Sequence, residues 1–184
     1  MRIISGKLKG KNISFLKSIT TRPLKDSVKE SIFNVISHSN LLDIKLENSN
    51  ILDLYSGIGS FGLECISRGA KKIIFVEKDK KVVEILKRNL FELNVNTDIT
   101  VITGQIESFL KKKLFDKFEI IFLDPPFAEK YNFFEDLNSI KKMNILASNH
   151  IIILHRESKT FDKFDGSFNV ILKKKYGRSQ VIFG

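Results

Sequence analysis

The sequence predicts an α/β fold built on a doubly wound, mostly parallel β-sheet. Short apolar runs alternate with longer amphipathic stretches between residues 51 and 154. This alternation is typical of strand–helix–strand units, whose strands lie parallel in one sheet. The apolar runs are continuous, which indicates strands covered by helices on both faces. A last pair of apolar runs around Gly177 predicts a terminal hairpin that adds two strands, one of them antiparallel.

Length and composition restrict the classes of protein to consider. With 184 residues, of which 42% are hydrophobic, the chain suits one compact domain with a small appendage. The single cysteine, Cys65, excludes an internal disulfide and a cysteine metal cluster, and we expect it to be a small helix residue. No run approaches the ~20 apolar residues of a membrane span, and the first residues lack the apolar region of a secretory signal. We therefore expect a cytoplasmic protein that does not bind membranes.

The net charge of +10 is concentrated at the two ends of the chain. Residues 1–30 carry eight basic and two acidic side chains, a net +6. Residues 170–184 carry four basic side chains and no acidic one, a net +4, so the middle of the chain is neutral. A polyanion that contacts both terminal segments would explain this distribution, and we expect an RNA or DNA partner.

The first fifty residues contain a hairpin, a helix and a connector. Residues 2–13 alternate apolar and polar side chains around two glycines, which predicts a short β-hairpin with lysines near its turn. A loop at residues 20–23 precedes a predicted helix over residues 24–37, whose apolar side chains recur near helical spacing. Residues 40–50 are polar and mark a soft boundary.

From residue 51 the chain alternates strands and helices. The expected strands cover residues 51–55, 73–76, 99–102, 118–123, 150–154, 168–175 and 178–183. The expected helices cover residues 61–68, 80–93, 106–113 and 133–146. Ligands of an open α/β sheet bind outside the carboxyl ends of its strands. The side chains that follow the first four strands are therefore the candidates for a site.

A glycine turn follows the first strand. Gly57, Gly59 and Gly62 have the spacing G-x-G-x-x-G, which lets backbone approach a ligand closely and begins a helix; we expect Gly62 to serve helix packing more than ligand contact. Glu77 ends the second strand, eighteen residues beyond Gly59, near the ~20-residue offset of an acid that binds ribose hydroxyls. This pattern fits a dinucleotide and an adenosyl ligand equally well.

Asp53, at the end of the first strand, helps to separate the two ligands. Beside a diphosphate its carboxylate would add repulsion in a partly desolvated site. Beside the amino group or the sulfonium of S-adenosylmethionine it would add attraction. S-adenosylmethionine is therefore the better candidate.

The most specific feature is Asp124-Pro-Pro-Phe127, directly after the fourth strand. Two prolines end a strand and fix the backbone, so this turn would aim the Asp124 carboxylate and the Pro125 carbonyl into the site. An aromatic amine is a weak nucleophile because its lone pair is delocalised. Two acceptors on its two N–H groups would localise that lone pair, and Phe127 would stack on the base. With an aligned sulfonium donor, methylation of such an amine needs no metal.

Several segments together resemble a known family. Those shared with class I S-adenosylmethionine-dependent methyltransferases that act on amines are 53-DLYSGIG-59, Glu77 and 124-DPPF-127. Those that resemble bacterial 16S ribosomal RNA guanine-N2 methyltransferases are 2-RIISGKLKGK-11, 22-RPLKDSVKESIFN-34 and 175-KYGRSQVIF-183. The resemblance spans nearly the whole chain. It implies a seven-stranded, Rossmann-like sheet and the methylation of one guanine in 16S rRNA, within a partly assembled small ribosomal subunit.

By position, the resemblance implies roles for individual residues. The cofactor would be bound at the ends of the first three strands by Asp53, Tyr55, Gly57, Gly59, Glu77, Lys78, Gln105 and Ile106. Gln105 stands where the family usually has Asp or Asn. The target amine would be held by Asp124, Pro125, Pro126 and Phe127.

RNA contacts are implied at both ends of the chain, through the basic residues Arg2, Lys7, Lys9, Lys11, Arg22, Lys29 and Arg178. Lys29 replaces an arginine of the family and keeps its charge without the bidentate fork. The soft boundary in the polar connector divides the chain into an RNA-binding extension, residues 1–40, and a methyltransferase domain, residues 41–184. We expect a monomer that uses S-adenosylmethionine and no metal.

Three other functions stay open on the sequence alone. A DNA adenine-N6 methyltransferase shares the Asp-Pro-Pro-aromatic turn, but it would carry a sizeable target-recognition segment, and none is visible. An NAD-dependent dehydrogenase is disfavoured by Asp53 and by the lack of a proton-transfer set, since only His155 ends a strand. A non-catalytic RNA-binding module would explain the terminal charge but would leave residues 124–127 without a role.

Overall fold

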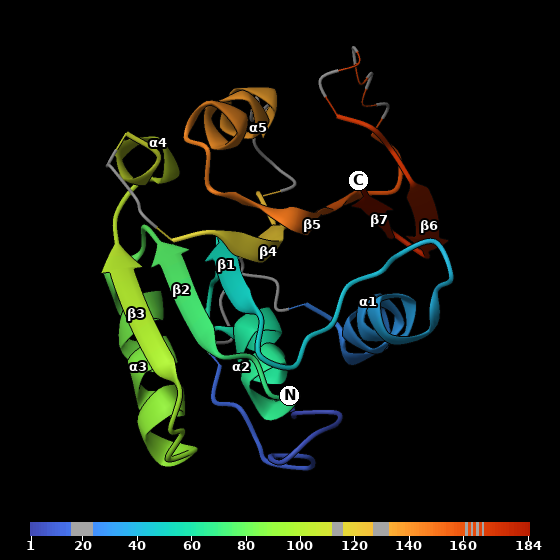
Figure 1. Cartoon of the computed structure of the whole chain (residues 1–184). Helices are drawn as coiled ribbons and strands as arrows, with labels where there is room; N and C mark the ends of the chain where they lie inside the picture. The colour runs from blue at the N-terminus through green and yellow to red at the C-terminus, as the bar shows by residue number, and fades with distance from the viewer. Residues whose placement is uncertain are drawn as a thin grey trace.

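A single seven-stranded sheet lies between two layers of helices (Figure 1). The computed structural model describes residues 1–15, 24–111, 116–126, 133–160, 162, 164, 166 and 168–184. Its strands are β1 (Asn50–Leu54), β2 (Lys72–Glu77), β3 (Asp98–Thr103), β4 (Phe118–Leu123), β5 (Leu146–Glu157), β6 (Leu172–Tyr176) and β7 (Ser179–Phe183). Across the sheet they follow the order β3-β2-β1-β4-β5-β7-β6.

The first five strands are parallel, and β7 is antiparallel to both of its neighbours, β5 and β6. This arrangement confirms the predicted α/β class, the mostly parallel sheet and the terminal hairpin. The strand order reverses between β1 and β4, because β2 and β3 extend to one side of β1 and β4 to the other. Such a switch leaves a crevice outside the carboxyl ends of the two strands, which is where ligands of this architecture bind.

Helices of the described residues cover both faces of the sheet: α1 (Asp26–His38), α2 (Ser60–Ser67), α3 (Lys80–Glu92), α4 (Ile106–Phe109) and α5 (Phe133–Lys142). Figure 1 shows α1, α2 and α3 on one face and α4 and α5 on the other. Successive strand residues alternate between the two layers, since Ile51 and Ile73 pack with the first group and Leu52 and Ile74 with the second. Continuous apolar strands were therefore the correct sign of a sheet buried on both faces.

The end of α5 and the start of β5 differ from the sequence-based prediction. The helix ends at Lys142, and Asn144 adopts a positive φ of 53°, which an α-helix does not accommodate. Leu146 then pairs with Phe118 of β4, so β5 begins four residues earlier than residue 150. At its other end, β5 extends to Glu157 because Arg156 and Glu157 pair with β7. The apolar stretch alone could not predict these polar ends.

Other boundaries differ by smaller amounts. The helix expected over residues 24–37 runs from Asp26 to His38, and the one expected over residues 106–113 ends at Phe109. The strand expected from residue 168 begins at Leu172. The N-terminal hairpin is present only as one antiparallel bridge, between Arg2 and Asn12, with turns between them.

The N-terminal segment shares its core with the rest of the fold. Ile3 and Ile13 are almost fully buried, in the same cluster as Ile32 and Phe33 of α1 and Phe61 of α2. Phe61 stacks between Phe33 and Phe122 of β4, with ring centroids 5.2 Å and 4.1 Å away. Within the described part of the chain, no helix has the length and apolar character required to cross a membrane.

Candidate active site at the carboxyl ends of the strands

The glycine turn between β1 and α2 contains three residues with positive φ: Tyr55 (59°), Gly57 (55°) and Gly59 (86°). A β-carbon at Gly57 would meet nothing within 4 Å, so the backbone there is open to an incoming ligand. At Gly59 it would lie 2.4 Å from Leu86 of α3, and at Gly62 it would lie 2.2 Å from the ring of Phe75. Gly62 therefore lets α2 pack closely on β2, in agreement with the packing role expected for it.

Asp53 lies beneath the start of α2. The residue is 1% exposed, and its Oδ2 accepts a hydrogen bond of 3.0 Å from the Gly62 N–H. Burial raises the pKa of the Asp53 carboxyl well above its usual range, and the nearby charges of Asp124 and Glu77 raise it further, against the Gly62 hydrogen bond. The predicted cofactor residue thus also ties the strand to the helix.

Glu77 lies at the rim of the glycine turn. Its Oε2 accepts from the Gly57 N–H at 3.0 Å and its Oε1 accepts from the Asp79 N–H at 2.9 Å. The Gly104 N–H donates to the Glu77 carbonyl at 2.9 Å, which brings the end of β3 beside the end of β2. Gln105 is therefore a near neighbour along the same edge, with an exposed side chain.

The remaining predicted cofactor residues lie at the same edge in different surroundings. Lys78 is exposed and Ile106, in the first turn of α4, is buried. Tyr55 is half-buried, and its hydroxyl donates a 2.6 Å hydrogen bond to Asp136, a buried carboxylate of α5. This bond joins the end of β1 to the helix layer on the far face.

Asp124 begins the proline turn at the end of β4, next to the end of β1. Its N–H donates to the Leu54 carbonyl at 3.4 Å. Asp124 and Pro126 are half-buried and Pro125 is buried, while Phe127 lies outside the described residues. The Asp124 Oδ1 is 2.7 Å from Nδ1 of His155, on β5.

Three carboxylates, on Asp53, Glu77 and Asp124, therefore gather at one edge of the sheet, where the first is influenced by the other two. Carboxyl groups gathered in this way disfavour a diphosphate and favour a ligand with cationic groups, beside which the ionised form of Asp53 is favoured again. Within the described part of the chain, no group of three or more His, Cys, Asp or Glu side chains is placed to hold a metal ion.

Lys29 does not lie on the surface, so its predicted contact with RNA is wrong. Its side chain is 0% exposed; its Nζ donates to the Arg2 carbonyl at 2.7 Å and lies 3.6 Å from the Glu64 carboxylate of α2, which is also 0% exposed. Burial lowers the pKa of the Lys29 ammonium, although Glu64 and Asp26 oppose that shift. Lys29 is buried because its face of α1 packs against α2 and the N-terminal segment.

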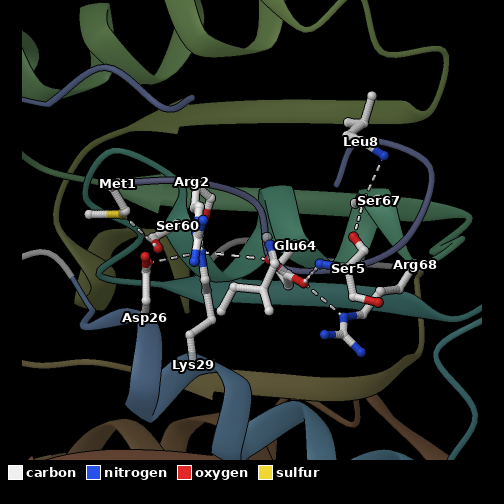
Figure 2. Close-up of polar contacts among 12 residues, drawn as sticks. Met1, Arg2, Ser5, Leu8, Asp26, Lys29, Ser60, Glu64, Ser67 and Arg68 are labelled. Carbon is white, nitrogen blue, oxygen red and sulfur yellow. Dashed lines mark hydrogen bonds and ion pairs between the residues drawn. The ribbon is translucent and has the colours of Figure 1, made fainter. Parts of the chain in front are cut away.

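Glu64 is the centre of this network (Figure 2). Besides Lys29, it accepts hydrogen bonds from the N–H groups of Ile4 (2.8 Å) and Ser5 (2.9 Å) and from Nε of Arg68 (3.0 Å). Glu64 is not among the site residues predicted from the sequence. One signal could have found it: the only acidic residue in an otherwise apolar and small helix, residues 60–67.

The other predicted RNA-binding residues that the structure describes are exposed. They are Arg2, Lys7, Lys9, Lys11 and Arg178, whereas Arg22 lies outside the described residues. Arg178 also pairs with Glu157 at 3.2 Å. These side chains are therefore accessible to a nucleic-acid partner.

The lysine-bearing turn lies at the far end of α2 from the glycine turn. Met1 contacts Ser60, the first residue of α2, through its sulfur at 3.1 Å. The N–H groups of Lys7 and Leu8 donate to Ser67, the last residue of that helix, at 2.7 Å and 2.9 Å. With a rise of ~1.5 Å per residue, the eight residues of α2 separate the two turns by roughly 12 Å.

A family of proteins described as conserved hypothetical protein 95 matches this chain over residues 1–184. A ribosomal RNA small subunit methyltransferase D from Haemophilus influenzae is 36% identical over 160 residues, which cover 85% of this chain and 79% of that protein. The protein of the same name from Buchnera aphidicola is 33% identical over 175 residues, which cover 95% and 85%.

Solved structures agree with this relationship. A candidate methyltransferase from Escherichia coli superimposes with a TM-score of 0.84 at 26% identity, covering 100% of this chain and 96% of that one. The similarity includes the N-terminal segment as well as the sheet, since the whole chain is matched.

Proposed function

Because this chain belongs to the family of the ribosomal RNA small subunit methyltransferases D, we propose that it methylates the exocyclic N2 amine of a guanine in 16S rRNA, with S-adenosylmethionine as the methyl donor. The coarser activity, methyl transfer to ribosomal RNA, follows from the family. The choice of guanine N2 is our proposal.

The strand ends suit S-adenosylmethionine. The open backbone at Gly57 and the carboxylates of Asp53 and Glu77 fit a ligand with a cationic amine, a sulfonium and two ribose hydroxyls. We propose that Tyr55, Gly59, Lys78, Gln105 and Ile106 complete the binding site. In this proposal Glu77 exchanges or shares its hydrogen bond with the Gly57 N–H when a ribose binds.

The observation that carries the proposal is the position of the Asp124-Pro-Pro turn. It lies directly beside the glycine turn, because the Asp124 N–H donates a hydrogen bond to the carbonyl of Leu54, the last residue of β1. The Asp124 carboxylate and the Pro125 carbonyl would accept from the two N–H groups of a target amine. They would also localise its lone pair, and Phe127 would stack on the base.

Methyl transfer then requires alignment more than further chemistry. When bound, S-adenosylmethionine supplies a methyl group whose bond to sulfur breaks as nitrogen attacks, with the electron pair left on sulfur. Asp124 holds the attacking amine in line, and its carboxylate can accept the proton that the methylated nitrogen releases.

For the partner, we propose 16S rRNA in a partly assembled small subunit, met by a monomer in the cytoplasm. The exposed basic side chains at both ends of the chain support an RNA substrate, with Arg22 and Phe127 as further proposed contacts. Ribosomal RNA also offers guanines that are unpaired or can be flipped out, as an exocyclic amine must be to enter such a site.

The test is to map methylated nucleotides by mass spectrometry. Purified protein is incubated with labelled S-adenosylmethionine and small subunits that lack the modification. We expect one N2-methylguanine in 16S rRNA, with 23S rRNA and genomic DNA as parallel controls. A label on adenine N6 of DNA, or none on any guanine, would overturn the proposal.

A further inference from the structure

His155 and Asp124 are neighbours across two parallel strands. Leu123, the last residue of β4, pairs with Leu154 of β5, so Asp124, directly after β4, lies beside His155. Both side chains point to the face that carries Asp53, since they alternate with leucines that pack on the opposite layer. The resulting distance from His155 Nδ1 to Asp124 Oδ1 is 2.7 Å.

This pair is shielded from water on the histidine side. The exposed fraction is 8% for the His155 side chain and 21% for that of Asp124. A hydrogen bond between a charged acceptor and a buried donor is stronger than one in water and holds its partners in one geometry. The outer part of the carboxylate stays accessible, as a group that meets substrate must be.

The chemistry of the two groups determines which atom carries the proton. An ionised carboxylate only accepts hydrogen bonds, so the contact requires a hydrogen on Nδ1 of His155. That hydrogen occupies Oδ1 of Asp124 and leaves Oδ2 for another donor. Because Nδ1 is already protonated, His155 cannot take a proton from Asp124 through this contact, and its role is to orient the carboxylate.

We propose that His155 is a positioning residue for methyl transfer, whose Nδ1–H fixes the Asp124 carboxylate so that its second oxygen faces the target amine. The inference rests on the proposed function of Asp124 as an amine acceptor. It assigns a role to a side chain that neither the glycine turn nor the proline turn contains. It also explains why a polar residue is buried within β5, directly after the apolar run that ends at Leu154.

The test compares two substitutions that differ in one donor. His155→Asn keeps an N–H near the position of Nδ1, whereas His155→Leu fills similar space without it. We expect His155→Leu to lower kcat by about 10–100-fold, since small misplacements of reacting groups have effects of this size. KM for RNA and Kd for S-adenosylmethionine should change less than about threefold, and His155→Asn should recover most of kcat. His150→Leu, an exposed histidine of the same strand, is the matched control.

Each outcome decides the proposal. Unchanged kcat in His155→Leu, or equal losses in the Leu and Asn variants with normal folding and cofactor binding, would overturn it. A measurement without activity separates it from the proposed function: nitrogen-15 NMR should place a proton on Nδ1 of His155 in the wild type. A ring protonated only on Nε2 would overturn the positioning role, whichever base is methylated. A mapped product other than N2-methylguanine would instead overturn the guanine assignment and leave the comparison of variants valid for that product.

Discussion

Asp53 accepts one hydrogen bond from Gly62 while it is almost completely withdrawn from water. Burial and the charges of Asp124 and Glu77 hold the pKa of its carboxyl well above the usual range. The ionised form is therefore disfavoured in the free protein. A cationic ligand at the strand ends would favour that form again, so the same residue would lower stability without ligand and raise affinity with it.

The pH dependence of stability tests whether Asp53 destabilises the protein in the absence of ligand. A raised folded-state pKa means that the contribution of Asp53 to stability is present below its unfolded pKa, ~3.9, and is lost as pH rises through the folded value. Asp53→Asn should therefore raise Tm at pH 8, and the difference from wild type should narrow as pH falls toward 5. Thermal melts of both proteins between pH 5 and 8 measure it. The same variant should lose affinity for S-adenosylmethionine, and a Tm difference that is independent of pH would contradict the assignment.

Asp124 is expected to act on the amine and not on the cofactor. Asp124→Ala should reduce methyl transfer by at least about 100-fold, because an acceptor that acts in the transition state is lost. Its Kd for S-adenosylmethionine should stay within a few-fold of wild type, measured by titration calorimetry. Activity that survives the substitution would exclude the amine-holding role.

At the scale of elements, α2 connects β1, the N-terminal segment and α1. Its first turn is fixed by Asp53, and its interior carboxylate, Glu64, binds the N-terminal segment, α1 and Arg68 together. Removing one partner of such a buried ion pair costs about 3–5 kcal/mol, because the other charge is left uncompensated. The network thus couples three segments that are far apart in the sequence.

A double-mutant cycle measures this coupling. Glu64→Gln alone should lower the free energy of unfolding by about 3–5 kcal/mol, since Lys29 then remains buried without its counter-charge. Lys29→Met combined with Glu64→Gln should be less destabilised than the sum of the single variants. Urea unfolding provides the values, and Lys25→Met, an exposed lysine just before α1, is the control. Additive effects would show that the two charges do not interact.

At the scale of the whole molecule, positive charge is distributed over separate surfaces. The turn with Lys7, Lys9 and Lys11 lies at the end of α2 remote from the strand carboxyl ends, and Lys173, Lys174 and Lys175 are exposed on the edge strand β6. Lysines on an edge strand also prevent pairing with other strands, so β6 has a structural reason for its charge. An RNA that meets both the active site and the N-terminal turn must extend along α2.

Salt dependence tests the N-terminal turn. Deleting residues 1–30 would remove the buried Ile3, Ile13 and Val28 from the core, so point substitutions are the better experiment. Replacing Lys7, Lys9 and Lys11 with Gln should weaken RNA binding and reduce the slope of log K against log salt by about 0.7–0.9 for each lost phosphate contact. Replacing the exposed Lys111, Lys141 and Lys142 with Gln changes the net charge equally. Identical slopes for the two triple variants would contradict a specific role for the turn.

Some parts of the molecule could be predicted from the sequence, and others could not. The fold class and the edge that carries Asp53, Glu77 and Asp124 were predictable, because apolar runs mark parallel strands and all their carboxyl ends meet at one edge. The exact ends of β5 were not, because Arg156 and Glu157 are strand residues only through their pairing with β7. The described residues include every predicted site position except Arg22 and Phe127.

By itself, the sequence determined the layer architecture, the glycine turn and the acidic strand ends, since these depend on local periodicity and on the fixed geometry of parallel strands. Only the tertiary structure decided that Lys29 is buried against Glu64, that His155 meets Asp124, and that the lysine turn lies at the far end of α2. Each of these depends on which surfaces of distant segments pack together. The type of a residue does not reveal whether its side chain lies on the surface or in the interior. Its neighbours in the folded chain determine that, and they also determine which charges it contacts.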